Sequence, residues 1–261
     1  MLIRKNKALI SSVEFNNINL SCYSNSEILE IIDSWIKNTS RKYICICATH
    51  VISLSSFNGQ VKKALLESSI NITDGRPLFW FVYLCVGSKA NHLRGMDFVH
   101  NLCAFANKKK LHIGFYGSKQ ETQKKAIINL KHNYPNVHFF SYIPPFGKQM
   151  DDHEQSLYLD LINKDKINIL FVVLGCPRQE IWMNRNQDKL NCICVGVGAA
   201  IDYIAGNLTV PNKIVYTLGL EWFLRLCMEP KRLFKRYLVF NSIYIYLFFK
   251  NLIKKIFDFN K

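Results

Sequence analysis

Short apolar runs rich in β-branched residues alternate along this chain with segments of helical character. The strand candidates are residues 43–48, 111–116, 136–141, 167–174 and 191–197. The helix candidates are residues 26–38, 60–68, 97–109, 119–133, 151–163 and 178–189. Such alternation is typical of an α/β fold, and continuously apolar strands are expected where both faces of a sheet are buried. We therefore predict a mostly parallel sheet covered by helices, with a weaker hairpin over residues 8–20 at the sheet edge.

The end of the chain differs from the rest in charge. The chain carries a formal net charge of +15, and residues 211–261 hold ten Lys or Arg but only three Asp or Glu. Such clustering favours a polyanionic partner. Pro211 marks a predicted boundary between an α/β catalytic domain, residues 1–210, and a basic helical appendage, residues 211–261.

The appendage is predicted to be amphipathic after Pro230. At helical spacing, one arc is basic and the opposite arc is apolar, which suits an anionic membrane surface or a phosphate-rich ligand. The basic arc is Lys231, Arg232, Lys235 and Arg236, and the apolar arc is Leu233, Phe234, Tyr237 and Leu238.

The run 237–249 is the most apolar stretch, but it is shorter than the roughly 20 residues that a membrane-spanning helix needs. We expect it to lie on a membrane together with Leu233, Phe234 and Tyr237. The alternative is a C-terminal helix packed on the domain or on a subunit partner. Cysteines occur as C-I-C pairs inside apolar runs, which favours buried thiols over metal ligands and agrees with a reducing cytoplasm.

Sites in α/β sheets form at the carboxyl ends of strands. Thr73-Asp74-Gly75 follows a short apolar run, and its carboxylate is either part of an ordinary turn or a base for a hydroxyl. Gly117-Ser118 follows another strand, where a capping box formed by Ser118 and Glu121 is favoured over a phosphate cradle.

Two further strand ends carry unusual residues. In LGCPRQE, residues 174–180, Gln179 and Glu180 fall in a first helical turn, where they either bind a base or sugar or are simply solvated. In residues 196–206, small residues allow either the close approach of a ligand or tight helix–strand packing.

Taken in this order, these strand ends resemble the WecG/TagA/CpsF family of bacterial glycosyltransferases over about residues 10–240. TDG at 73–75 resembles the DG motif of the family, and LGCPRQE resembles G-x-P-K-Q-E with Arg178 for the usual Lys. GAAIDYIAGN at 198–207 and the pair Gly95 and Asp97 also resemble family positions. The most specific match is GLEWFLRLCMEP at 219–230.

The resemblance implies a Rossmann-like α/β body with a C-terminal helical appendage for membrane association. It implies an inverting, metal-independent transferase without a cofactor. The enzyme would move an N-acetylhexosamine, typically N-acetylmannosamine, from a UDP-sugar to a polyprenyl-diphosphate-linked sugar in surface polysaccharide synthesis. It would be cytoplasmic, held at the inner face of the cell membrane through residues 211–261, and compatible with a homo-oligomer.

The resemblance also assigns roles to residues. Asp74 matches the proposed base of the family. The donor-binding positions are Thr73, Gly75, Gly117, Gly175, Gln179, Glu180, Gly198 and Asp202. The positions for the diphosphate or acceptor are Arg225, Arg232 and either Lys235 or Arg236. Since the chain has no D-x-D motif to hold a metal–diphosphate pair, cationic side chains are expected to stabilise the departing UDP.

Departures from the family pattern leave a different hexose or acceptor open. The usual Thr-x-Asn pair is replaced in CICATHV by Cys45 and Cys47, or by Thr49 under a shifted alignment, and His92 stands where Arg is common. Two alternatives to an enzyme are a nucleic-acid-binding protein, suggested by the charge, and an inactive scaffold. Against the first, no nucleic-acid-binding motif is present, so we expect no nucleic-acid partner.

Overall fold

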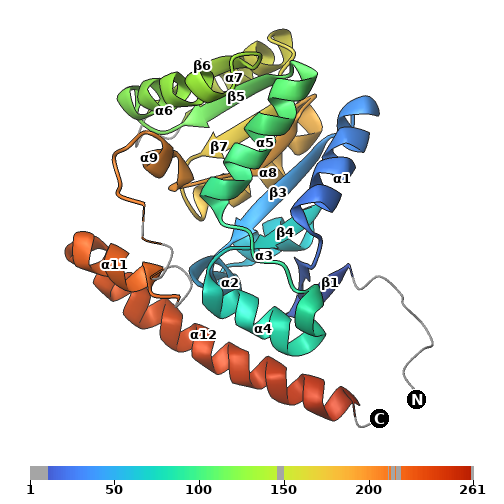
Figure 1. Cartoon of the computed structure of the whole chain (residues 1–261), viewed down its shortest axis with the longest axis vertical. Helices are drawn as coiled ribbons and strands as arrows, with labels where there is room; N and C mark the ends of the chain where they lie inside the picture. The colour runs from blue at the N-terminus through green and yellow to red at the C-terminus, as the bar shows by residue number, and fades with distance from the viewer. Residues whose placement is uncertain (1–10, 146–149, 211, 213–214, 216–218, 260–261) are drawn as a thin grey trace.

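The computed structural model describes residues 11–145, 150–210, 212, 215 and 219–259, apart from the side chains of residues 232, 258 and 259. A six-stranded sheet with the order β4-β3-β8-β7-β5-β6 forms its centre, and every strand pairing in it is parallel (Figure 1). Its strands are β3 (Lys42–Cys47), β4 (Ile70–Thr73), β5 (His112–Gly117), β6 (His138–Tyr142), β7 (Ile169–Val173) and β8 (Ile193–Gly196). The predicted parallel sheet and all five strand candidates are confirmed.

The sheet separates two hydrophobic cores. Alternate residues of β3 divide between them, because successive side chains of a strand point to opposite faces. Tyr43, Cys45 and Cys47 are buried in one core and Ile44 in the other. The C-I-C cysteines are buried free thiols, as the sequence pattern predicted: Cys45 and Cys47 in β3, Cys194 in β8 and Cys192 just before it.

Helices cover both faces of the sheet (Figure 1). One face is covered by α1 (Asn25–Lys37), α5 (Gly95–Lys109), α6 (Gln120–Asn133) and α9 (Ala200–Ile204). The other is covered by α2 (Thr49–Ser55), α3 (Gly59–Leu66), α4 (Arg76–Val86), α7 (Asp152–Lys164) and α8 (Arg178–Asn186). The predicted helices are confirmed within a few residues, whereas α2, α4 and α9 were not anticipated.

The N-terminal hairpin forms its own two-stranded sheet from β1 (Ser12–Phe15) and β2 (Ile18–Ser21). Its turn residues Asn16 and Asn17 both have positive φ, the backbone that favours a two-residue hairpin turn. Asn71 of the edge strand β4 donates its Nδ2 hydrogen to the carbonyl of Asn19 at 3.1 Å. The hairpin therefore lies at the sheet edge, as expected, without extending the main sheet.

The predicted capping box at Ser118 and Glu121 is wrong. Ser118 has a φ of 70°, whereas a capping residue has an extended backbone. Helix α6 begins at Gln120 with no side-chain cap, and the buried Gln123 donates to the carbonyl of Gly117 instead. The turn before α6 is thus held by a hydrogen bond from the buried Gln123 and not by a side-chain cap at Ser118.

Within residues 219–259, the chain forms the helices α11 (Glu221–Met228) and α12 (Pro230–Phe259). Figure 1 shows α12 as a long helix that runs along the body beside α2 and α4. Tyr244 donates its hydroxyl hydrogen to the carbonyl of Pro77 at 2.6 Å, and Ser53 donates to the carbonyl of Phe240 at 2.9 Å. Near its end, Lys254 pairs with Glu14 at 3.5 Å. Helix α12 is therefore anchored along its length.

The outer face of α12 stays apolar and exposed. Its large exposed apolar residues are Phe234, Leu238, Val239, Ile245, Tyr246, Phe249, Ile253, Ile256 and Phe257. Leu233, Tyr244 and Leu247 are buried against the body, so the expectation that Leu233 and these two residues of the run 237–249 face a bilayer is wrong. None of the helices in the described ranges is long and apolar enough to span a membrane. The predicted boundary residue Pro211 lies outside the described residues.

Candidate active site

A cavity of about 670 Å³ opens at the carboxyl ends of β3, β4, β7 and β8. Ligands in open α/β sheets bind at this edge, where neighbouring strands connect in opposite directions. Residues from α4, α8, α11 and α12 complete its walls. The C-terminal helices therefore contribute directly to the cavity that the strand ends begin.

Asp74 lies on the cavity wall directly after β4. Its backbone N–H donates to the carbonyl of Cys47 at 2.8 Å, and its Oδ1 accepts a hydrogen bond from the backbone N–H of Gly95 at 3.4 Å. Gly75 follows with a φ of 84°, which lets the chain turn from the strand into α4. Burial, followed by the charge of Glu221, raises the pKa of Asp74 to about 6.

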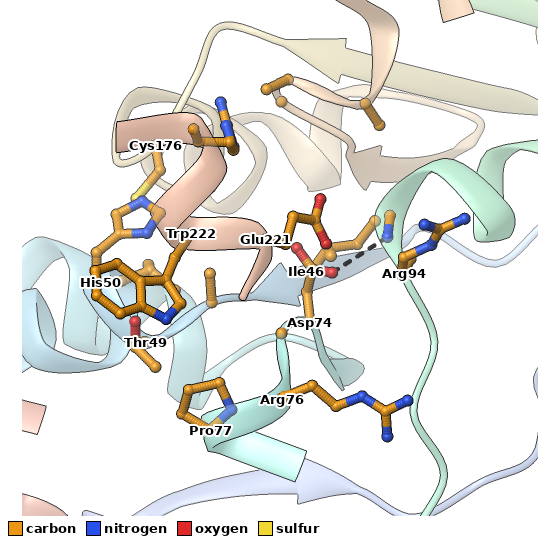
Figure 2. A pocket seen from close by; sticks show the side chains of 18 of the residues that line it. Ile46, Thr49, His50, Asp74, Arg76, Pro77, Arg94, Cys176, Glu221 and Trp222 are labelled. Carbon is orange, nitrogen blue, oxygen red and sulfur yellow. Dashed lines mark hydrogen bonds between the residues drawn. The ribbon is translucent and has the colours of Figure 1, made fainter. Parts of the chain in front are cut away.

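Glu221, the first residue of α11, brings a second carboxylate to Asp74. Figure 2 shows the two carboxyl groups pointing toward one another. Burial raises the pKa of Glu221, while the charges of Arg94 and Arg225 oppose that rise. Arg94 itself pairs with Asp97 at 2.8 Å. Sequence reasoning did not single out Glu221 or Arg94, although Glu221 stands within the GLEW stretch.

Gln179 and Glu180 lie in the first turn of α8 and are 4% and 1% exposed. The alternative of a solvated helix start is therefore wrong for these two side chains. Gln179 donates its Nε2 hydrogen to Oε1 of Glu180 at 2.9 Å, and burial raises the pKa of Glu180. The Oε1 atom of Gln179 is buried without a hydrogen-bond partner in the described part of the chain. Both side chains line the cavity, so the unpartnered amide oxygen of Gln179 and the carboxyl group of Glu180 are placed where they could contact a ligand.

Because Gly196 and Gly198 have no side chains, they leave space for the side-chain amide of Gln179. A Cβ on Gly196 would lie 3.0 Å from Nε2 of Gln179 and 2.8 Å from Cε of Met183. A Cβ on Gly198 would lie 3.4 Å from Oε1 of Gln179. The small residues after β8 thus serve tight packing and at the same time border the cavity.

Basic side chains reach the cavity from the C-terminal helices. Arg225 of α11 and Arg236 of α12 line the cavity, and the guanidinium of Arg225 lies 5.9 Å from the ring centre of Tyr203. Lys235 is exposed and is not a lining residue. Of the two candidates for the third basic position, the structure therefore brings Arg236 to the cavity. The side chain of Arg232 lies outside the described residues.

The sequence model of the WecG/TagA/CpsF glycosyl transferase family matches residues 13–257. The chain belongs to this family. A relative from Bacillus subtilis (strain 168) is 27% identical over 169 residues, which are 64% of each chain. One from Staphylococcus aureus (strain MW2) is 22% identical over 233 residues, 87% of each chain. Both relatives are named N-acetylglucosaminyldiphosphoundecaprenol N-acetyl-beta-D-mannosaminyltransferase. The first match spans slightly less than two thirds of the Bacillus protein.

Three of the predicted donor-binding residues do not line the cavity. Thr73 is buried and donates its hydroxyl hydrogen to the carbonyl of Asn91 at 3.1 Å. Gly117 packs so closely that a Cβ there would lie 2.8 Å from the carbonyl oxygen of Val173. Asp202 holds the end of α9, where its carbonyl accepts a hydrogen bond from the backbone N–H of Asn207 at 2.9 Å. These three residues therefore stabilise the structure next to the cavity and are not part of its lining.

Among the described residues, no group of three or more His, Cys, Asp or Glu side chains is placed to hold an ion. The Asp152-His153-Glu154 stretch forms the start of α7, where Asp151 and Glu154 make a capping box. The ionisable side chains that line the cavity include three carboxyl groups, those of Asp74, Glu180 and Glu221, together with several arginines.

Proposed function

We propose that this chain transfers an N-acetylhexosamine from a UDP-sugar to a polyprenyl-diphosphate-linked sugar, as a step in surface polysaccharide synthesis. The names of its relatives support N-acetylmannosamine as the sugar and N-acetylglucosaminyl diphosphoundecaprenol as the acceptor. The observation that carries the proposal is the meeting of Asp74, at a strand end, with Arg225, from α11, in one cavity. A base and a phosphate-binding group are the two functions that this transfer needs.

In the proposed reaction, the carboxylate of Asp74 takes the proton from the attacking hydroxyl of the acceptor. The hydroxyl oxygen forms a bond to the anomeric carbon while the bond from that carbon to the UDP oxygen breaks. UDP leaves with the electron pair, and attack opposite to it inverts the anomeric configuration. A pKa of about 6 suits Asp74 to this role, because a base works best when its pKa lies near the working pH.

We propose that arginines, rather than a metal ion, stabilise the departing diphosphate. Guanidinium groups bind phosphate oxygens in pairs of hydrogen bonds, and they act most strongly where water is excluded. Arg225 lies close enough to Asp74 to lower its pKa, so the base and the phosphate-binding group share one region of the cavity. Arg236 supplies a second guanidinium from α12. The reaction needs no cofactor in this scheme.

We further propose that residues 211–261 serve as an appendage that holds the enzyme on the inner face of the cell membrane. Support comes from the exposed apolar face of α12, which is accompanied by exposed Lys231, Lys235 and Lys250. Exposed aromatic residues on α4 and α11, Trp80 and Trp222, stand at the walls of the same cavity. Such a surface would bring the cavity to a lipid-bound acceptor.

The experiment that tests the transfer uses radiolabelled UDP-N-acetylmannosamine and an N-acetylglucosaminyl diphosphate on a short prenyl chain. We expect a labelled lipid product that Asp74→Asn enzyme does not form. Parallel reactions with UDP-N-acetylglucosamine and UDP-glucose identify the preferred sugar. Failure to transfer from any UDP-hexosamine, by protein that binds UDP, would overturn the proposal.

A further inference from the structure

His50 is the feature of the cavity that the family resemblance does not explain. It is the second residue of α2 and belongs to CICATHV, the stretch where this chain departs from the family pattern. Its side chain lines the cavity beside Cys176 and Trp222 (Figure 2). Its Nε2 atom is buried and has no hydrogen-bond partner among the residues that the structure describes. Buried polar atoms nearly always have partners, so this nitrogen indicates a ligand.

The surroundings of His50 are positively charged. Burial, followed by the charges of Arg236 from α12 and Arg225 from α11, lowers the pKa of His50 to about 3. The neighbouring thiol of Cys176 is neutral, because burial raises its pKa. His50 is therefore an uncharged imidazole with one N–H donor and one acceptor nitrogen.

A second buried nitrogen points to the same ligand. The Nε atom of Arg225 also lacks a hydrogen-bond partner in the described ranges. The carboxylates that act on Arg225 are Asp74 and Glu221, and they do not contribute to the shifted pKa of His50. The charges that act on His50 are thus those of the two arginines, while the buried carboxyl of Glu180 acts on the neighbouring Cys176.

We propose that His50 donates a hydrogen bond to a diphosphate held between Arg225 and Arg236. The inference rests on the proposed function, in which both substrates carry a diphosphate. A neutral donor suits this position because it is next to the apolar ring of Trp222, where a third charge would be costly to desolvate. The diphosphate comes either from the UDP of the donor or from the polyprenyl acceptor.

Calorimetric binding of inorganic pyrophosphate tests the site without requiring catalysis. We expect His50→Leu to weaken pyrophosphate binding about tenfold, the effect of one charge-assisted hydrogen bond. His50→Gln keeps an N–H at similar reach and should retain most of the affinity. His50→Asn is polar but too short to reach the same point, so it should lose affinity like His50→Leu. The matched control is His153→Leu on exposed α7, which should bind as the parent protein does.

Two further measurements identify the source of the diphosphate. If it belongs to the donor, His50→Leu weakens UDP binding but not uridine binding, and the KM for the UDP-sugar rises. If it belongs to the acceptor, UDP binding is unchanged and the KM for the prenyl diphosphate acceptor rises. Either result supports the site.

Unchanged affinities and unchanged KM values in both His50→Leu and His50→Asn would overturn it. Equal losses in His50→Gln and His50→Leu would also overturn it, because they indicate packing rather than a hydrogen bond. If His50→Leu does not fold, the pyrophosphate affinities of His50→Gln and His50→Asn are compared instead. Higher affinity in His50→Gln supports the site, and equal affinities overturn it. If the proposed function is wrong but the site is right, the protein transfers no sugar, yet its pyrophosphate binding still depends on His50. The two hypotheses can therefore fail separately.

Discussion

The backbone N–H of Gly95 donates to Oδ1 of Asp74 at 3.4 Å, so the first residue of α5 holds the carboxylate that follows β4. The two residues are far apart in the sequence, and both belong to motifs shared with the family. A Cβ on Gly95 would meet Ile46 and Ala200 at 3.7 Å, an ordinary contact distance. The position therefore serves Asp74 through its backbone. Through this hydrogen bond, the start of α5 helps to position the carboxylate that we propose as the base.

Replacing Asp74 separates catalysis from stability. Asp74→Asn should lower the transfer rate by about two to four orders of magnitude, the usual contribution of a general base. The pKa of Asp74 is about 6 in the folded protein, above the ordinary value near 3.8, so the folded state binds its proton more tightly than the unfolded state. This stabilisation is complete below the ordinary pKa and is lost as pH rises through 6. At pH 8 the melting temperature of Asp74→Asn should therefore equal or exceed that of the parent. A fully active variant would contradict the assignment.

The pH profile depends on Glu221. Because Asp74 must be ionised to take a proton, kcat/KM should fall as pH falls through about 6. The charge of Glu221 raises the pKa of Asp74, so Glu221→Gln should move this acidic limb to lower pH. The control is Glu121→Gln, a change at an exposed residue of α6, which should leave the pH dependence of kcat/KM unchanged. An identical limb in Glu221→Gln and the parent would show that the two carboxylates do not interact.

Neighbouring basic residues on α12 should behave differently. Arg236 lines the cavity, whereas Lys235 is exposed outside it. Arg236→Ala should reduce kcat/KM at least about tenfold through a lost charge-assisted contact to phosphate. Lys235→Ala should leave transfer to a short-chain acceptor nearly unchanged. The reverse order of effects, measured by steady-state kinetics, would place the third basic position at Lys235.

A glycine replacement tests the packing behind Gln179. In Gly196→Ala, the new Cβ would lie 2.8 Å from Cε of Met183 and 3.0 Å from Nε2 of Gln179. We expect a loss of about 1–3 kcal/mol in the free energy of unfolding, typical of overpacking, together with weaker UDP binding. Gly59→Ala is the control, because no atom lies within 4 Å of its Cβ position. Denaturant unfolding compares the two variants, and equal stability would show that Met183 and Gln179 yield without cost.

Much of this architecture follows from the sequence. The strands of the parallel sheet were predictable because each is a continuous apolar run, and turn residues mark their ends. Helix α4 was missed because RPLFWFVYLCV is apolar on all sides, so it has no helical period to detect. Its Trp80, Tyr83 and Leu84 are exposed. The capping box failed because Ser118 has a left-handed backbone, next to a glycine packed tightly against β7, and the residue pattern does not reveal this.

The site was predictable only in part. Motif resemblance identified Asp74, Gln179, Glu180 and Arg225, all of which line the cavity. It did not find His50, because no family motif matches that residue and it lies in CICATHV, the stretch where the chain departs from the family pattern. A helical wheel of α12 separates basic from apolar residues, but it cannot say which apolar residues face protein. The buried Leu233 and the exposed Phe234 are neighbours in sequence and were predicted to lie on the same face.

The exposed face of α12 predicts membrane binding that is separable from catalysis. Leu238 and Phe249 are 61% and 56% exposed and do not line the cavity. The double change Leu238→Glu and Phe249→Glu should release the protein from vesicles that contain anionic lipid, because it removes buried apolar area and adds repulsion. Activity on a short, soluble acceptor should persist. The control is Leu157→Glu on α7, also exposed, which should float with the vesicles as the parent does. Equal flotation of the double variant and the control would show that another surface meets the membrane.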